Sequence, residues 1–102
     1  MARPVHPPAS VQPYIEVSFP GSPHDPALEA AVHRWVARLE PAIEDAVRVD
    51  VKIDRSARRR TTVGLTILGG SDGPRTAATS HQDAYVAVSD AFRAVRLQLL
   101  GR

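Results

Sequence analysis

Residues 47–54 alternate strictly between apolar and charged side chains, and this pattern constrains the fold more than any other part of the sequence. The apolar set is Val47, Val49, Val51 and Ile53, and the charged set is Arg48, Asp50, Lys52 and Asp54. Successive side chains of a strand point to opposite faces, so the alternation predicts a strand with one face on a core and the other in water. We therefore expect a sheet with one covered face and one open face.

Three further segments are predicted to be strands. Residues 14–19 and 61–68 alternate in the same way, with these apolar side chains inward: Ile15, Val17, Phe19, Val63, Leu65 and Ile67. The six-residue link at 55–60 predicts an antiparallel hairpin between the second and third strands. A Gly-rich turn cluster at 69–74 then leads to a short fourth strand at 75–79.

Two segments carry helical periodicity. The first begins at Asp25-Pro26, with Asp as N-cap and Pro in the first turn, and ends at about Glu40 because Pro41 follows. Its apolar face is Leu28, Val32, Trp35, Val36 and Leu39. The second is predicted to begin with a capping box at Ser80–Asp83 and to end at Gly101. Its apolar stripe is Tyr85, Val88, Phe92, Val95 and Leu99, so Trp35 and Tyr85 are both expected in the core. Tyr14 and Tyr85 could instead stack on nucleobases, but the place of Tyr85 on the stripe favours the core.

The predicted order is β-α-β-β-β-α, and the fold class is α+β. The inward strand faces and the two helical stripes suit a two-layer sandwich, a four-stranded sheet with two helices on one face. The 102 residues form one domain at 14–102, preceded by a flexible Pro-rich tail at 1–13. The absence of cysteine excludes disulfides and thiolate chemistry, and no secretory signal or membrane span is visible, so we expect a cytoplasmic protein.

Charge is distributed unevenly along the chain, although the net charge is only +2. Residues 1–54 hold five basic and eight acidic side chains, and residues 55–102 hold eight basic and three acidic. Arginine is the main cation, and its planar guanidinium pairs well with phosphate, although a GC-rich genome also favours arginine. The sharpest cluster is Arg58-Arg59-Arg60, with Arg55 on the same loop.

The last helix and the strand before it resemble the ribosome hibernation-promoting factor and ribosome-associated inhibitor family, also called sigma-54 modulation proteins. The segment Arg75-Thr-Ala77 resembles the family's basic fourth strand, and Asp83-Ala-Tyr85-Val-Ala87-Val88 resembles its Asp-x-Tyr-x-Ala-Ile motif. The pattern continues through Ala91-Phe92, Val95 and Gln98-Leu99, and the first helix matches in spacing. Ser89 stands where the family usually has Asp, and Ala94 and Leu97 stand where it usually has Lys or Arg.

The resemblance implies a cytoplasmic bacterial protein that binds the small ribosomal subunit in the channel used by mRNA and tRNA. Such a protein suppresses translation or stabilises idle ribosomes when growth slows. The resemblance implies no cofactor, no metal and no catalysis. The Lys-rich tail and the additional C-terminal domain of longer relatives are missing from this sequence, so a monomer or weak homodimer is expected.

Nine arginines are the candidate contacts with ribosomal RNA. Four lie on the predicted hairpin loop: Arg55, Arg58, Arg59 and Arg60. Four lie on the outer faces of the two helices, where they could form one strip: Arg34, Arg38, Arg93 and Arg96. Arg75 lies on the fourth strand. The open sheet face alternates in sign and is expected to neutralise itself, so we exclude it as a phosphate track.

Other functions were weighed against this hypothesis. A divergent RNA-binding or regulatory protein-interaction domain of the same fold, without hibernation activity, would use the same basic loop. An adaptor that binds protein through the open sheet edge is a third reading. An enzyme is disfavoured, because the histidines lack metal-ligand spacing and no nucleophile elbow or glycine-rich anion loop is present.

Overall fold

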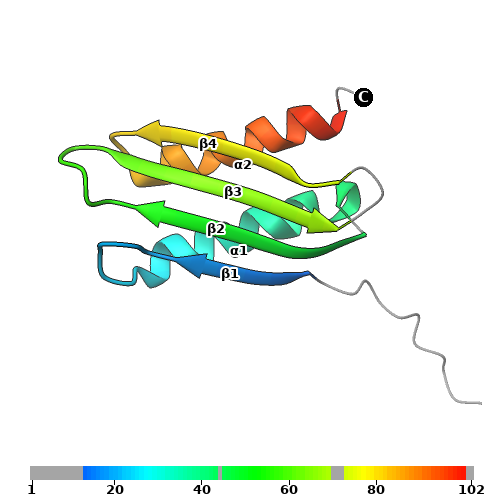
Figure 1. Ribbon diagram of the computed structural model, residues 1–102, viewed down its shortest axis with the longest axis horizontal. Coiled ribbons are helices and arrows are strands. Elements are labelled where there is room, and N and C mark those ends of the chain that lie inside the picture. Colours follow the sequence, from blue (N-terminus) through cyan, green and yellow to red (C-terminus); the bar gives the residue numbers. More distant parts are fainter. Residues whose placement is uncertain (1–12, 44, 70–72, 101–102) are drawn as a thin grey trace, which may run out of the picture.

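The computed structural model describes residues 13–43, 45–69 and 73–100, and these form a four-stranded sheet with two helices on one face (Figure 1). The elements are β1 (Tyr14–Ser18), α1 (Pro26–Leu39), a 3-10 turn (Glu40–Ala42), β2 (Ala46–Asp54), β3 (Thr61–Gly69), β4 (Arg75–His81) and α2 (Ala84–Leu100). The predicted α+β class and the order β-α-β-β-β-α are confirmed. The predicted tail falls almost entirely on residues 1–12, which lie outside the described residues.

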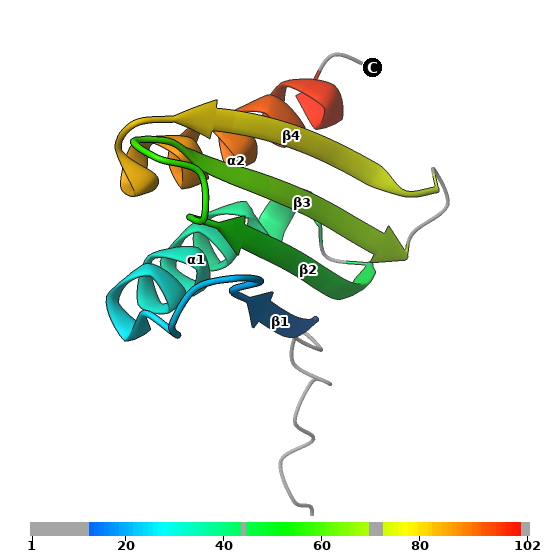
Figure 2. The same ribbon diagram turned by 60° about the vertical axis from the view of Figure 1, so that its left-hand side comes forward.

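The sheet order is β1-β2-β3-β4, with one parallel and two antiparallel pairings. β1 runs parallel to β2, so the chain must cross over between them, and α1 makes this crossing on the covered face. β2 and β3 form the predicted hairpin, and β4 pairs antiparallel with β3. Figure 2 shows both helices on the same side of the twisted sheet, which leaves the other face open.

The core lies between the sheet and the helix layer. Its fully buried side chains come from both layers: Leu28, Val32, Val49, Val51, Ile53, Val63, Leu65, Val88, Phe92 and Val95. Burial of such a side chain contributes about 1.5–3 kcal/mol, and the strands and helices predicted from periodicity supply all of them.

The start of β2 departs from the predicted alternation. Val47 is 63% exposed, and Ala46 occupies the buried position instead. The cause is a register shift between Ala46 and Arg48, which places an extra residue opposite β3 and turns the Val47 side chain outward. Gly69 lies opposite this irregularity with a φ of +105°, and a Cβ there would lie 2.7 Å from the backbone nitrogen of Val47.

The beginning of α2 also differs from the prediction. Ser80 and His81 belong to β4, where they pair with Thr62 and Thr61, so the predicted capping box on Ser80 is wrong. Asp83 is the cap: its Oδ1 accepts hydrogen bonds from the backbone nitrogens of Tyr85 at 2.8 Å and Val86 at 3.4 Å. The cap of α1 is the predicted one, because Asp25 Oδ1 accepts from the nitrogens of Ala27 and Leu28.

Two aromatic side chains that were expected in the core lie at its margin. Tyr85 is 48% exposed, because α2 buries a face that does not include it, made of Ala84, Ala87, Val88, Ala91, Phe92 and Val95. Trp35 is only partly buried and packs against the core from the outside. Its ring stacks on Phe92 with a centroid distance of 5.8 Å and an interplanar angle of 10°.

Candidate functional site

A groove runs between α1 and α2 and is lined with arginine. Its volume is about 510 Å³, and its walls are Trp35, Arg38, Leu39, Pro41, Ala42, Arg93 and Arg96. Arg38 lies in the last turn of α1, while Arg93 and Arg96 are one turn apart on α2. Because the two helices pack side by side, residues far apart in the sequence meet in one surface.

Trp35 links the groove to the hydrophobic core. One side of its ring stacks on Phe92, and the guanidinium carbon of Arg38 lies 5.0 Å from its ring centroid. A cation over an indole ring is attracted by the ring quadrupole, so this contact restrains the Arg38 side chain without neutralising its charge. The guanidinium N–H groups of Arg38 therefore remain available to an anion.

A smaller hollow of about 180 Å³ adjoins the groove and shares Trp35 and Arg38 with it. Its other lining residues are Ala31, Arg34 and Tyr85. The structure places the four helix arginines in two adjoining parts of one surface: Arg34 and Arg38 line the hollow, and Arg38, Arg93 and Arg96 line the groove. In the part of the chain that the structure describes, no ion pair joins these arginines to a carboxylate.

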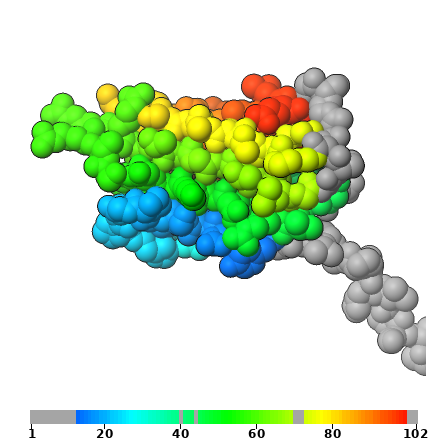
Figure 3. All heavy atoms as spheres, viewed as in Figure 1, coloured from blue at the N-terminus to red at the C-terminus, as the bar shows by residue number. Residues whose placement is uncertain are grey.

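The hairpin loop between β2 and β3 forms a second basic surface. The loop projects from one end of the molecule, at the left of Figure 3. Arg58 and Arg59 are exposed on it and form no ion pair within the described residues. The other two loop arginines are engaged: Arg60 Nε donates to Ser80 Oγ at 2.5 Å, and Arg55 Nη1 lies 2.9 Å from Asp25 Oδ2.

The two basic surfaces lie toward opposite ends of the sheet (Figure 1). The loop joins the ends of β2 and β3 that lie near the start of both helices, whereas Arg38, Arg93 and Arg96 lie in the second halves of the helices. Arg75 opens β4 at the groove end of the sheet and is partly buried, opposite Ile67. The nine candidate arginines thus form no single patch.

The sequence matches the family model described as Sigma 54 modulation protein / S30EA ribosomal protein over residues 15–100. The chain belongs to this family. Two solved structures share its fold: a ribosomal subunit interface protein from Coxiella burnetii and the N-terminal domain of Protein Y from Thermus thermophilus. The Coxiella protein superposes on this chain with a TM-score of 0.76 and 18% sequence identity. The alignment covers 86% of this chain and 94% of the Coxiella chain.

The Protein Y domain superposes on this chain with a TM-score of 0.72 and 14% sequence identity. The alignment covers 85% of this chain and 94% of the Protein Y chain. No curated protein matches the sequence. At these identities the structural likeness shows the fold, while the family model shows the family membership.

The motif shared with this S30EA family now has a structural explanation. Asp83 caps α2, and Ala87 and Val88 are fully buried against the sheet. Tyr85 does not serve the core and lines the hollow between the helices. In the sequence, Tyr85 falls on the apolar stripe and so resembles a core residue. The alanines at 84, 87 and 91 indicate that the buried face of α2 is centred away from Tyr85.

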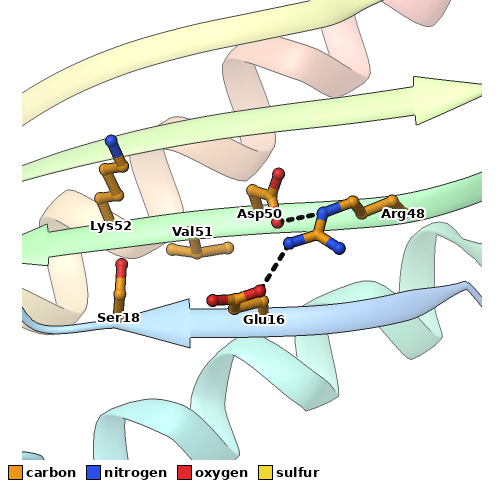
Figure 4. Close-up of a pocket in the computed structure, with 6 residues that line it drawn as sticks. All are labelled: Glu16, Ser18, Arg48, Asp50, Val51 and Lys52. Atoms are coloured by element: carbon orange, nitrogen blue, oxygen red, sulfur yellow. Dashed lines mark hydrogen bonds and ion pairs between the residues drawn. The ribbon is translucent and has the colours of Figure 1, made fainter.

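The open sheet face of this family member is neutralised by its own charges, as the alternation predicts. Figure 4 shows a hollow of about 170 Å³ there, over β1 and β2. Arg48 Nη2 lies 2.5 Å from Glu16 Oε1, and its Nε lies 2.8 Å from Asp50 Oδ1. The hydrogen bond to Asp50, and secondarily the two nearby negative charges, raise the pKa of Arg48. Arg48, the arginine that lines this hollow, is therefore already paired with two carboxylates.

Metal binding and membrane insertion find no support in the described ranges. Residues 13–43, 45–69 and 73–100 contain no group of three or more His, Cys, Asp or Glu side chains arranged to hold a metal ion. The same residues include no helix with the length and apolar character needed to cross a bilayer.

Proposed function

We propose that this protein binds the ribosomal RNA of the small subunit through the groove between α1 and α2, and that it suppresses translation or stabilises idle ribosomes under stress. The observation that carries the proposal is the convergence of Arg38, Arg93 and Arg96 on one groove, without carboxylate partners among the described residues. The S30EA family membership and the fold shared with a ribosomal subunit interface protein from Coxiella burnetii support the ribosome as the partner.

The physical basis is phosphate binding by arginine. Each guanidinium presents a planar fork of N–H donors that fits a phosphate, and each contact releases counterions from the RNA. These arginines have no ion pair within the described residues, so RNA binding does not require an existing ion pair to be broken. The protein acts by occupying its site, in the cytoplasm, and neither a cofactor nor a catalysed reaction is part of the proposal.

Arg58 and Arg59 on the hairpin loop supply a second contact. They lie toward the other end of the domain from the groove, so the two surfaces would contact separate parts of the RNA (Figure 1). Arg60 and Arg55 are proposed as minor contacts, because each already binds another side chain. Arg34, in the adjoining hollow, and Arg75, at the start of β4, are proposed as further contacts.

We also propose that the protein is a monomer or a weak homodimer. Leu97 is 69% exposed on α2, but a single leucine supplies far less apolar area than a stable interface requires.

Cosedimentation with purified small subunits over a range of salt concentrations tests the ribosomal proposal. The three groove contacts give a slope of log K against log salt of about −2 to −3, and the loop contacts of Arg58 and Arg59 make the slope steeper. Affinity should therefore fall at least about 20-fold between about 50 and 200 mM salt. Absence of binding at the lower concentration would contradict the proposal and favour the regulatory protein-interaction reading of the same fold.

A further inference from the structure

The hollow beside the groove combines two features that phosphate binding alone does not require. Two of its five lining side chains are aromatic, Trp35 and Tyr85, and two are arginine, Arg34 and Arg38. Tyr85 is 48% exposed, although Ala84, Ala87 and Val88 near it on α2 are buried. An exposed aromatic ring next to unpaired arginines is the combination by which proteins hold single-stranded nucleic acid.

We propose that this hollow takes one unpaired nucleobase of RNA, which stacks on Tyr85 beside Trp35 while the arginines of the adjoining groove hold the flanking phosphates. The inference rests on the proposed function, because it uses the same groove. It goes further by naming the RNA element that is recognised: an unpaired nucleotide and not the regular backbone of a duplex.

The size of the hollow agrees with this occupant. Its volume of about 180 Å³ is roughly ten times the space that one water molecule needs, so a single planar ring system can enter it. A base in a duplex is stacked between its neighbours and cannot enter such a hollow. The larger groove of about 510 Å³ shares Trp35 and Arg38 with it, so phosphates next to a base in the hollow would lie toward Arg93 and Arg96.

Arg38 lines both the hollow and the groove, so it can contact a base in the hollow and a phosphate in the groove. Its guanidinium lies over the Trp35 ring, which also stacks on Phe92. The Trp35 ring is therefore held in place by its packing against the core, and the Arg38 side chain is held in place by its contact with that ring. The RNA is bound through ring faces and charge, so little preference among the four bases is expected.

Fluorescence titration of the intact protein tests this inference, because Trp35 is the single tryptophan of the chain. The two probes are an unstructured RNA strand of about eight nucleotides and a duplex of the same length. The single strand should quench Trp35 and bind more tightly than the duplex. Tyr85→Ala should weaken single-strand binding about fivefold or more, the lower end of what one stacked base contributes, and Tyr85→Phe should restore it.

Tyr14→Ala is the matched control, since Tyr14 is also an exposed tyrosine but lies on β1, away from the helix groove. It should leave both affinities unchanged. Equal single-strand affinity in the wild type and Tyr85→Ala, with no quenching of Trp35, would overturn the inference. Small-subunit binding in that case would leave the proposed function standing, whereas Tyr85-dependent single-strand binding without subunit binding would support the inference and contradict the ribosomal proposal.

Discussion

Arg55 Nη1 donates a hydrogen bond to Asp25 Oδ2 over 2.9 Å, and this contact fastens the base of the hairpin loop to the start of α1. The other oxygen of the same carboxylate accepts the capping bonds from Ala27 and Leu28. Asp25 thus connects two elements that lie thirty residues apart in the chain. Arg55, which the sequence suggested as an RNA contact, has a structural role at this end of the domain.

The stability of the fold should depend on the charge of Asp25. The backbone hydrogen bond from Leu28, followed by those from Ala27 and Arg55, holds the pKa of Asp25 below its usual value. A lowered pKa in the folded state stabilises the protein fully above about pH 4, and this stabilisation is lost as the pH falls toward the lowered pKa. Asp25→Asn keeps a capping oxygen but loses the charge.

The variant should therefore unfold at a lower temperature than the wild type at pH 7, with the difference shrinking between about pH 4 and pH 2. Thermal unfolding followed by circular dichroism measures this. The relevant quantity is the difference between the two proteins, because Asp54 also has a lowered pKa, through its bonds from Ser56, and contributes to acid sensitivity in both. A difference that is independent of pH would refute the role assigned to Asp25.

Substitution by alanine should destabilise the protein at Gly69 but not at Gly64, although both glycines lie on β3. Gly69→Ala should lower the free energy of unfolding by about 1–3 kcal/mol, since the residue has a positive φ and the new Cβ would collide with the Val47 backbone. Gly64→Ala meets nothing within 4 Å and should be neutral or slightly stabilising. Urea denaturation of both variants distinguishes these effects, and equal losses would show that the irregularity at Val47 does not constrain Gly69.

Reversing the loop charges should affect binding and not stability. Arg58→Glu combined with Arg59→Glu should reduce small-subunit affinity about tenfold or more while changing the free energy of unfolding by less than about 0.5 kcal/mol. The conservative pair Arg58→Lys and Arg59→Lys keeps the charge and should retain most of the affinity. Unchanged affinity in the charge-reversed protein would show that the loop does not contact the RNA.

Much of the fold follows from periodicity, because each strand and helix buries one face against one core. The alternation at 48–54 and the cap at Asp25 were predictable for this reason. The irregularity at Val47 was not, since an extra residue in a strand depends on how the partner strand pairs. The start of α2 was misplaced because Ser80 can cap a helix or extend a strand, and the pairing of β4 with β3 decides between them.

The candidate site was predictable in its residue types but not in its grouping. Spacing alone places Arg93 and Arg96 on one face of a helix, and the same argument applies to Arg34 and Arg38. The distance between the hairpin loop and these helix faces depends on the tertiary arrangement, so the separation into two surfaces emerges only from the structure. Tyr85 was assigned to the core in preference to base stacking, because its spacing from Val88 and Phe92 is also that of a core residue.

The salt dependence of small-subunit binding in matched charge-removal variants tests the central claim most directly. Arg93→Gln with Arg96→Gln removes two groove cations, while Lys52→Gln removes an exposed cation of the open sheet face. The slope of log K against log salt should become less steep by about two in the groove variant and stay unchanged in Lys52→Gln. Equal slopes for the wild type and the groove variant would contradict the assignment of the groove as the RNA-binding surface.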